Sequence, residues 1–335
     1  MSVTLKKIAN ELGMSVSLVS QVLNGKASES RIKKETELIV LNKSEELGYI
    51  PNKIARGLRT KKTNTIALLT PNLADPFFAK IIKIVQNELQ TLGYNLMILE
   101  SNDETEKEIY EMKLVQSNGI DGMIIIPVAD EYSHIEKLSK NNYPVVLLYR
   151  AFKKDIDVST IAVDHYYNIF QIVSLLVKKG HTKIGLIHGV TNRLANTARL
   201  KGYKKALKQN KIVYNKNYVI KMGFERHHGY QGTKKLLELE EPATAIILNG
   251  DLQTFGALEA IKEKKLKIPK DIALFSTNIL DIASFLFAPI STLIHPIEEM
   301  GKTAVYTLID KIEKKESKKI KIFVKSKLNI IEKSF

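Results

Sequence analysis

The chain has 335 residues, no cysteine and no tryptophan, and its lysines and arginines outnumber its aspartates and glutamates by 51 to 36. This length favours two or three domains with a substantial buried core. The lack of cysteine excludes disulfides, thiolate metal sites and thiol nucleophiles, and it fits a reducing compartment. The net charge of +15 favours binding to polyanions such as nucleic acids.

The positive charge is concentrated towards the N-terminus. Residues 1–62 carry 12 basic and 6 acidic side chains, whereas residues 63–335 carry 39 and 30. Lys6 and Lys7 are not followed by a long apolar segment, so we expect no secretory signal. The longest apolar stretches, such as Gly122–Val128, are too short to span a bilayer. We therefore expect a soluble, cytoplasmic protein that does not bind membranes.

Residues 4–24 predict two short helices joined by a tight turn. Gly13 interrupts the first apolar run, and Ser15 can cap a second run over residues 16–23. The apolar side chains of the first run recur at helical spacing: Leu5, Ile8, Ala9 and Leu12. This pattern is typical of a helix-turn-helix, whose second helix enters the DNA major groove. Two amphipathic helices of an ordinary bundle are the alternative.

A third helix is predicted over Arg31–Leu47, ended by Gly48. Its apolar side chains are expected to close a small core over the first two helices: Ile32, Leu38, Ile39, Leu41 and Leu47. Pro51 can then start a short helical segment, residues 52–59, which is too short to be stable alone in water. Gly57 weakens that segment by about 1 kcal/mol relative to alanine. We expect it to become helical only when another molecule holds it.

From Thr65 onwards, apolar runs alternate with helical ones. The apolar runs predict parallel strands buried on both faces: Ile66–Leu69, Tyr94–Leu99, Gly122–Ile126, Val145–Leu148, Ile161–Val163, Ile184–Ile187, Tyr218–Ile220, Ala245–Leu248 and Ile272–Phe275. Helices are predicted between them, near residues 77–92, 105–118, 131–142, 165–179, 196–209, 227–238 and 252–264. Two such sets imply two doubly wound lobes with a ligand cleft at the carboxyl ends of the strands. Neither GxGxxG nor GxxxxGK[ST] occurs, so no nucleotide cofactor is expected.

Several stretches together carry a family resemblance: VTLKKIANELGMSVSLVSQVLNG, EELGYIPN, IARGLRTKKTNTIALL, PNLADPFF, KKGHTKIGLIHG, ARLKGYKKAL, PATAIILNGD, FGALEAIKEKKLKIPKDIAL and PISTLIHP. In this order, over nearly the whole chain, they resemble the lactose/galactose repressor (LacI/GalR) family of bacterial transcription regulators. The resemblance implies an all-α headpiece over residues 1–50, a hinge helix and linker over 51–62, and an α/β core over 63–335. The core is expected to be two-lobed and doubly wound, like periplasmic sugar-binding proteins. Its lobes are expected at residues 63–159 with 291–322, and 160–290 with 323–335.

The resemblance also implies contacts with DNA. Val16, Ser17 and Gln21 match the family's base-reading positions, and a glutamine can bond in a bidentate manner to adenine N6 and N7. Val19 is interpreted as a packing residue. Leu58 matches the hinge leucine that inserts into the minor groove and kinks the DNA. The other expected DNA contacts are Thr4, Ser15, Ser20, Asn24, Asn52 and Ala55.

An effector is expected to bind between the lobes. The residues that match pocket positions in relatives are Phe77, Phe78, Asp164, Arg193, Arg199, Phe224, Asp251 and Asn278. Aromatic faces can stack on a sugar or base ring, and Arg199 can give paired hydrogen bonds to hydroxyls or a phosphate. The phenylalanines could instead be core residues, and Asp251 could cap a helix over 252–262. Asn278 stands where the family usually has aspartate, so no particular sugar is assigned.

The sequence thus predicts a homodimeric transcription regulator and not an enzyme. We expect a repressor of a carbohydrate-utilisation operon that binds a near-palindromic operator in double-stranded DNA. A sugar or sugar phosphate is expected to control it allosterically. The seven histidines are scattered, so no metal site is expected. The alternatives are a catabolite-type global regulator controlled by a phosphocarrier protein, and a purine-responsive repressor. A solute-binding transport protein would share the core but would need an export signal.

Overall fold

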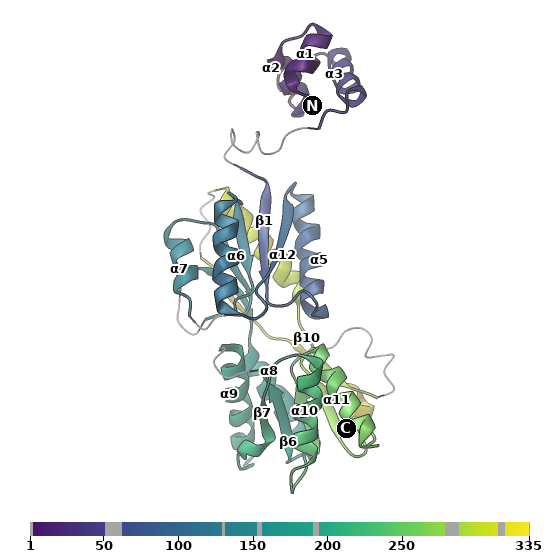
Figure 1. The fold of residues 1–335 in the computed structure, drawn as a ribbon. Coiled ribbons are helices and arrows are strands. Elements are labelled where there is room, and N and C mark those ends of the chain that lie inside the picture. The colour runs from purple at the N-terminus through teal and green to yellow at the C-terminus, as the bar shows by residue number, and fades with distance from the viewer. Residues whose placement is uncertain are drawn as a thin grey trace. The chain divides into compact units, whose positions relative to one another are not determined.

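The computed structural model describes residues 3–50, 62–128, 131–152, 156–189, 194–278, 288–313 and 319–334. Their contacts divide the chain into two compact units, Met1–Thr63 and Asn64–Phe335, which are described separately below (Figure 1). Among the described helices, none combines the length and hydrophobicity that a membrane-spanning segment needs.

The first unit is a headpiece of three helices, α1 (Leu5–Leu12), α2 (Val16–Leu23) and α3 (Lys34–Glu46). Thr4 and Ser15 cap α1 and α2, because their hydroxyl oxygens accept the backbone N–H groups of Lys7 and Leu18. Gly13 ends α1 at φ 63°, a left-handed conformation that glycine adopts without a steric penalty. The predicted helix, tight turn and helix are therefore confirmed.

A small core holds these helices together. Its fully buried side chains include Ile8, Val19, Val22 and Val40. Ile8 comes from α1, Val19 and Val22 from α2, and Val40 from α3, so each helix contributes to it. The prediction that Val19 is a packing residue is confirmed.

The expectation for the third helix is partly wrong. Ile32 and Leu47 pack against the headpiece core, but Leu38, Ile39 and Leu41 are exposed. The reason is geometric, because α3 turns Val40 and Ser44, which are one turn apart, towards α1 and α2. The apolar neighbours of Val40 in sequence then fall on other faces of the helix.

The first lobe of the second unit is built on a parallel sheet with strand order β11-β5-β4-β3-β1-β2. Its strands are β1 (Thr65–Thr70), β2 (Asn95–Glu100), β3 (Gly122–Ile125), β4 (Val145–Tyr149), β5 (Ser159–Val163) and β11 (Lys321–Val324). Helices α5 (Pro76–Thr91) and α12 (Ile297–Ile312) pack on one face, and α6 (Thr105–Ser117) and α7 (Ser133–Lys140) pack on the other. The central strands are buried on both faces, which explains their continuous apolar runs.

The second lobe is built on a sheet with strand order β12-β10-β9-β8-β6-β7, in which β12 pairs with β10 in antiparallel fashion. Its strands are β6 (Ile184–His188), β7 (Val219–Lys221), β8 (Ala245–Leu248), β9 (Ala273–Ser276), β10 (Ser291–Ile294) and β12 (Lys327–Asn329). Its helices are α8 (His165–Lys178), α9 (Leu194–Gln209), α10 (Arg226–Leu237) and α11 (Asp251–Glu263), with short 3₁₀ helices at Lys216–Tyr218 and Glu332–Ser334. A Cβ at Gly202 of α9 would collide with the Tyr166 carbonyl of α8, so these two helices pack unusually closely.

The lobe boundaries differ from those expected. Strand β5 belongs to the first sheet and β10 to the second, so residues 160–163 lie in the first lobe and residues 291–294 in the second. In the described part of the chain, the backbone crosses between the lobes at residues 164, 295–296 and 325–326. Asn168 Nδ2 donates to Ser326 Oγ at 2.9 Å, and that Oγ lies 2.5 Å from His295 Nδ1. Side-chain hydrogen bonds therefore tie two of the crossings together beside α8.

Candidate functional site

The exposed side of α2 brings the predicted base-reading residues together. Val16 is 44% exposed although it is apolar, Ser17 is exposed, and Gln21 is partly exposed one turn further along. Val19 and Val22 point to the core on the opposite side. One side of α2 thus presents a methyl-bearing, a hydroxyl and an amide side chain to the solvent.

The predicted phosphate-contacting residues also hold the helix ends. Ser15 Oγ accepts the Leu18 N–H at 3.1 Å, and Asn24 Nδ2 donates to the Ser20 carbonyl at 2.6 Å. A hydroxyl that accepts one hydrogen bond keeps its own proton to donate, so Thr4 and Ser15 can still donate to a phosphate. The expected hinge contacts, Asn52, Ala55 and Leu58, lie outside the described residues.

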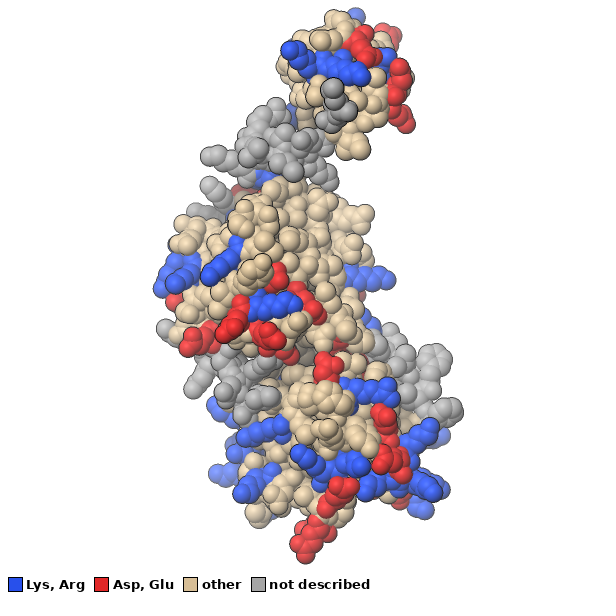
Figure 2. All heavy atoms as spheres, in the orientation of Figure 1, with Lys and Arg blue, Asp and Glu red and all other residues tan. Residues whose placement is uncertain are grey.

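The positive charge of the N-terminal part is not spread evenly. Residues 3–50 carry seven basic and six acidic side chains, whereas residues 51–62 carry five basic and none acidic. Within the headpiece, Lys43 Nζ lies 3.2 Å from Glu11 and 2.9 Å from Glu46. Figure 2 shows carboxylates gathered along one edge of the headpiece and lysines elsewhere on the visible face. The strongest positive charge therefore lies in the linker sequence.

A cavity of about 270 Å³ lies between the two lobes of the second unit. The first lobe lines this cavity with Asn72, Asp75, Phe77, Phe78, Asn102, Asp103, Tyr149 and Arg150. The second lobe lines it with Arg199, Gly223, Phe224, Glu225, His228, Asn249, Gly250, Leu252, Thr277 and Asn278. Most of these residues follow the carboxyl ends of strands, which is where ligands bind in doubly wound sheets.

Aromatic rings form one wall of this cleft. Phe77 and Phe78, at the start of α5, are almost fully buried, pack in the first lobe's core and also line the cleft. The two rings are therefore core residues that also face the cleft, and their contact with an effector stays a prediction. The centroid of the Phe77 ring lies 4.7 Å from that of the Tyr149 ring. Tyr149 was not predicted from the sequence as a cleft residue. Tyr149 has φ 67°, a strained backbone conformation for a bulky residue and one that tends to occur at functional sites.

Two arginines supply positive charge to the cleft. Arg199 is only 6% exposed, its Nη1 donates to Asn196 Oδ1 at 2.9 Å, and its guanidinium lies 6.0 Å from the Phe224 ring. Burial lowers the pKa of Arg199 to about 10, so the group stays charged at neutral pH. Arg150 Nη1 lies 3.4 Å from Asp103 Oδ1 and donates to the Pro127 carbonyl at 3.2 Å. Planar guanidinium groups suit hydroxyls and phosphates because they donate paired hydrogen bonds.

Hydrogen-bond acceptors complete the cleft. Asn249 Nδ2 donates to the Ile187 carbonyl at 2.7 Å, but its buried Oδ1 has no hydrogen-bond partner among the described residues. A buried polar atom of this kind is costly unless a ligand or water satisfies it. Asp75 Oδ1 accepts the Phe77 N–H at 2.9 Å, and burial raises the pKa of its carboxyl. Asn278 and Phe224 line the cleft as predicted.

Two of the predicted effector residues do not line the cleft. Asp164 caps α8 by accepting the Tyr167 N–H at 2.9 Å, and it faces a different cavity. Asp251 is the first residue of α11 and is 1% exposed, and it interacts with another residue of the chain. It is not the helix cap either, since Gly250 holds that position. Arg193 lies outside the described residues.

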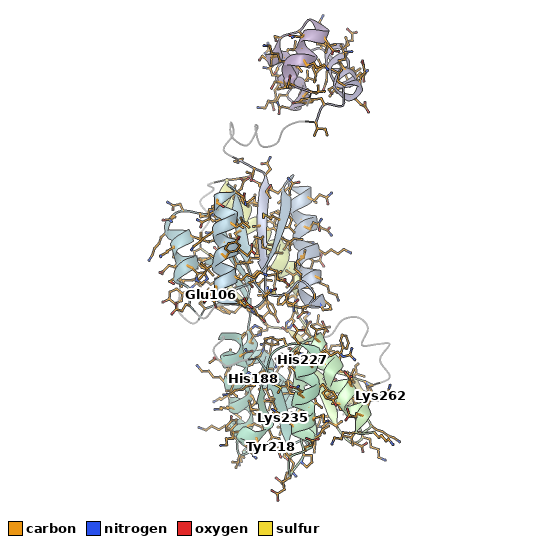
Figure 3. All side chains as sticks on the ribbon, in the orientation of Figure 1. Glu106, His188, Tyr218, His227, Lys235 and Lys262 are labelled. Carbon is orange, nitrogen blue, oxygen red and sulfur yellow. The ribbon has the colours of Figure 1, made fainter. Side chains whose placement is uncertain are left out.

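Two histidines lie next to each other, because the ring centroids of His227 and His228 at the start of α10 are 3.8 Å apart. Figure 3 labels His227 and also His188, which ends β6. No group of three or more His, Asp or Glu side chains in the described part of the chain is arranged to hold a metal ion.

Comparisons with known proteins agree with this architecture. Residues 4–52 match the family model described as "Bacterial regulatory proteins, lacI family", and residues 63–329 match "Periplasmic binding proteins and sugar binding domain of LacI family". Catabolite control protein A of Priestia megaterium is 27% identical, covering 95% of this chain and 94% of its own. The transcriptional repressor CytR of Escherichia coli K12 is also 27% identical, over 92% of this chain and 90% of CytR. The crystal structure of the lac repressor dimer bound to operator and the anti-inducer ONPF superposes with a TM-score of 0.87 at 23% identity. The match covers 100% of this chain and 99% of the repressor chain.

Proposed function

Since the chain belongs to the LacI family of bacterial DNA-binding transcription regulators, we propose that it represses genes for carbohydrate use. A sugar or sugar phosphate in the inter-lobe cleft controls its affinity for operator DNA. The observation that carries the proposal is the combination, around one cavity beside an aromatic wall, of Arg199, Arg150 and the Asn249 Oδ1, which has no hydrogen-bond partner among the described residues. Sugar hydroxyls both donate and accept, so they match this mixed set of groups.

The two guanidinium groups favour a phosphorylated sugar over a neutral one. Arg199 is buried, and its Nη1 donates to the neutral amide of Asn196. A phosphate would give this guanidinium a charge-assisted partner in a site of low dielectric. The sugar ring would then pack on the phenylalanines, and the Asn249 carbonyl would accept from a ring hydroxyl.

On the DNA side, we assign base contacts to Val16, Ser17 and Gln21. The Val16 side chain suits a thymine methyl, and the Gln21 amide suits adenine. Thr4, Ser15, Ser20 and Asn24 contact phosphates and fix the register of α2 in the groove. Asn52, Ala55 and Leu58 are assigned to the minor groove from their match to the family's hinge.

A homodimer reads the two halves of the operator. Strand β2 ends the strand order of the first sheet, and its Ile98 is 40% exposed. Edge strands with exposed apolar side chains are suited to association with a second chain. The first lobe therefore offers a surface for dimerisation.

Calorimetric titration of the full chain tests the cleft assignment. The panel comprises sugars, sugar phosphates and purines. We expect one sugar phosphate to bind, and Arg199→Met to weaken it by roughly a hundredfold because a charge-assisted pair is lost. Arg226→Met is the matched control, since Arg226 pairs with Glu259 and does not line the cleft.

Binding that is unchanged in the Arg199 variant would contradict the assignment. If only a purine bound, the purine-responsive alternative would replace the sugar. If nothing bound, control by a phosphocarrier protein would become the leading account.

A further inference from the structure

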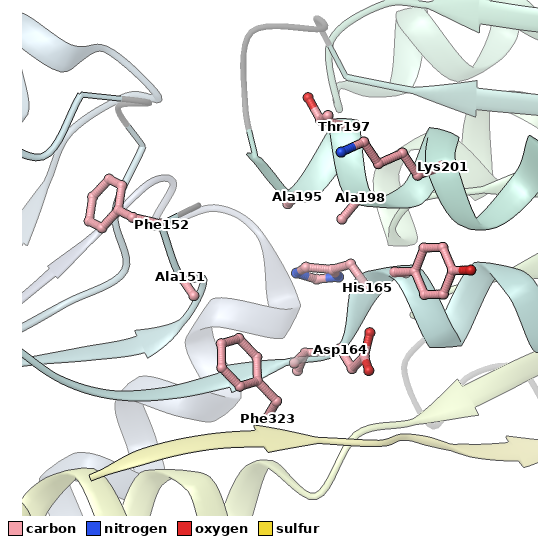
Figure 4. Close-up of a pocket in the computed structure, with 11 residues that line it drawn as sticks. Ala151, Phe152, Asp164, His165, Ala195, Thr197, Ala198, Lys201 and Phe323 are labelled. Carbon is pink, nitrogen blue, oxygen red and sulfur yellow. The ribbon is translucent and has the colours of Figure 1, made fainter. Parts of the chain in front are cut away.

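A second cavity, of about 240 Å³, lies where β5 leads into α8, and it shares no lining residue with the inter-lobe cleft (Figure 4). The first lobe contributes Phe152 after β4 and Phe323 on β11. The second lobe contributes Asp164 and His165 at the start of α8 and Lys201 on α9. The cavity is therefore walled by both lobes beside one of the chain crossings.

The walls combine flat apolar surfaces with one charge of each sign. Phe323 is 55% exposed, so part of its ring is open to contact with a ligand. Lys201 extends along the wall of the cavity near Thr197 and Ala198 (Figure 4). Its side chain is exposed and forms no ion pair with any described residue. Asp164 uses Oδ1 to accept the Tyr167 N–H, which leaves its second carboxylate oxygen able to accept another bond.

His165 connects this cavity with the cleft. The residue is 8% exposed, and its Nε2 has no hydrogen-bond partner among the described residues. Its ring lies 5.3 Å from that of Tyr149, which lines the cleft. Helix α9 is shared as well, since Lys201 lines the second cavity and Arg199 lines the cleft. A molecule bound in one cavity would thus touch elements that also form the wall of the other.

We propose that the second cavity is a separate binding site for a small aromatic carboxylate that carries a hydroxyl group opposite its carboxylate. The ring packs among Phe152, Phe323 and Ala198. The carboxylate accepts hydrogen bonds from the Lys201 ammonium, and the hydroxyl donates to Asp164. The site does not require a sugar in the cleft, so it stands or falls independently of the proposed function.

Calorimetric titration of the full chain with 4-hydroxybenzoate tests the proposal. For a ligand of this size we expect a Kd of about 1 mM or below. Lys201→Met removes the charge and keeps the apolar stem, so it should weaken binding by roughly tenfold or more. Lys208→Met, an exposed lysine further along α9 that does not line the cavity, should leave the Kd unchanged. Benzoate, which lacks the hydroxyl, should bind several-fold more weakly than 4-hydroxybenzoate.

A second variant tests the site without changing its charge. Ala198→Phe fills the space between the aromatic walls and should abolish binding, while the circular dichroism spectrum and thermal midpoint report whether it folds. The proposal is overturned if 4-hydroxybenzoate fails to bind the unmodified chain at 10 mM, roughly ten times the expected Kd. It is equally overturned if the Lys201→Met and folded Ala198→Phe chains bind as tightly as the unmodified one.

Discussion

His188 and His295 are buried histidines of the core whose ring nitrogens are poorly satisfied. Both nitrogens of His188, and Nε2 of His295, lack hydrogen-bond partners among the described residues. Burial is the main cause that lowers the pKa of each to about 4. An unfolded histidine has a pKa of about 6.5. Between these values the unfolded chain binds protons that the folded chain does not, so acidification destabilises the fold.

The free energy of unfolding should therefore fall as the pH drops from about 6.5 to 4, by about 1 kcal/mol per pH unit for each histidine. Urea unfolding at pH 7 and pH 5 measures this loss. His188→Leu should reduce it, because the variant removes one of the groups that protonate on unfolding. An equal loss in the His188 variant and the unmodified chain would show that this histidine does not carry the effect.

At single residues, the sequence was informative where a motif surrounds the position. Phe77, Phe78 and Arg199 lie within recognisable stretches, and the cleft contains all of them. Tyr149 was missed because it ends an ordinary buried strand, where nothing local distinguishes it from a core residue. Asn249 was missed although it lies in the recognisable stretch PATAIILNGD, in which only Asp251 was singled out. The position of each at the carboxyl end of a strand was the available signal. Asp164 was expected in the cleft but caps α8 and lines the second cavity, and its sequence context does not distinguish these positions.

Helix α2 depends on Ser15, whose hydroxyl accepts the Leu18 N–H. Ser15→Ala should destabilise the headpiece by about 1 kcal/mol, because a backbone N–H at the helix start loses its partner. Hydrogen exchange of the α1 and α2 amides, measured by mass spectrometry on the full chain, reports this loss. Ser15→Asp keeps a capping oxygen and should retain protection, although its charge should weaken DNA binding. Unchanged protection in the alanine variant would contradict the capping role.

The elements themselves were largely predictable. Strands buried on both faces produce continuous apolar runs, and β1, β3 and β4 follow that rule. Helix α3 was harder, since the exposed Leu38, Ile39 and Leu41 carry the same hydrophobic signal as the buried Val40. Periodicity cannot separate such neighbours, because tertiary packing decides which of them is covered. The predicted hinge helix falls on residues outside the description and stays a prediction.

At the scale of the whole molecule, the two-lobed plan followed from the repeated strand–helix pattern, but the exchange of segments between the lobes did not. Strand β11 pairs with β5 in the first sheet, although the strands before and after it in the chain, β10 and β12, belong to the second sheet, so its membership depends on long-range pairing. The crossings near Asp164, His295 and Ser326 are the consequence. Side-chain hydrogen bonds between Ser326 and both Asn168 and His295 tie two of these crossings together.

The most direct measurement is the affinity of the full chain for a selected near-palindromic duplex, with a scrambled duplex of equal length as the control. Ionic strength must be held fixed, because binding to phosphates depends steeply on salt. We predict that the palindrome is preferred at least about a thousandfold, and that the sugar phosphate identified by calorimetry changes its affinity by roughly tenfold or more. The Arg199→Met chain should keep the preference and lose the response. Equal affinity for both duplexes, or a response that survives in that variant, would contradict control of operator binding through the cleft.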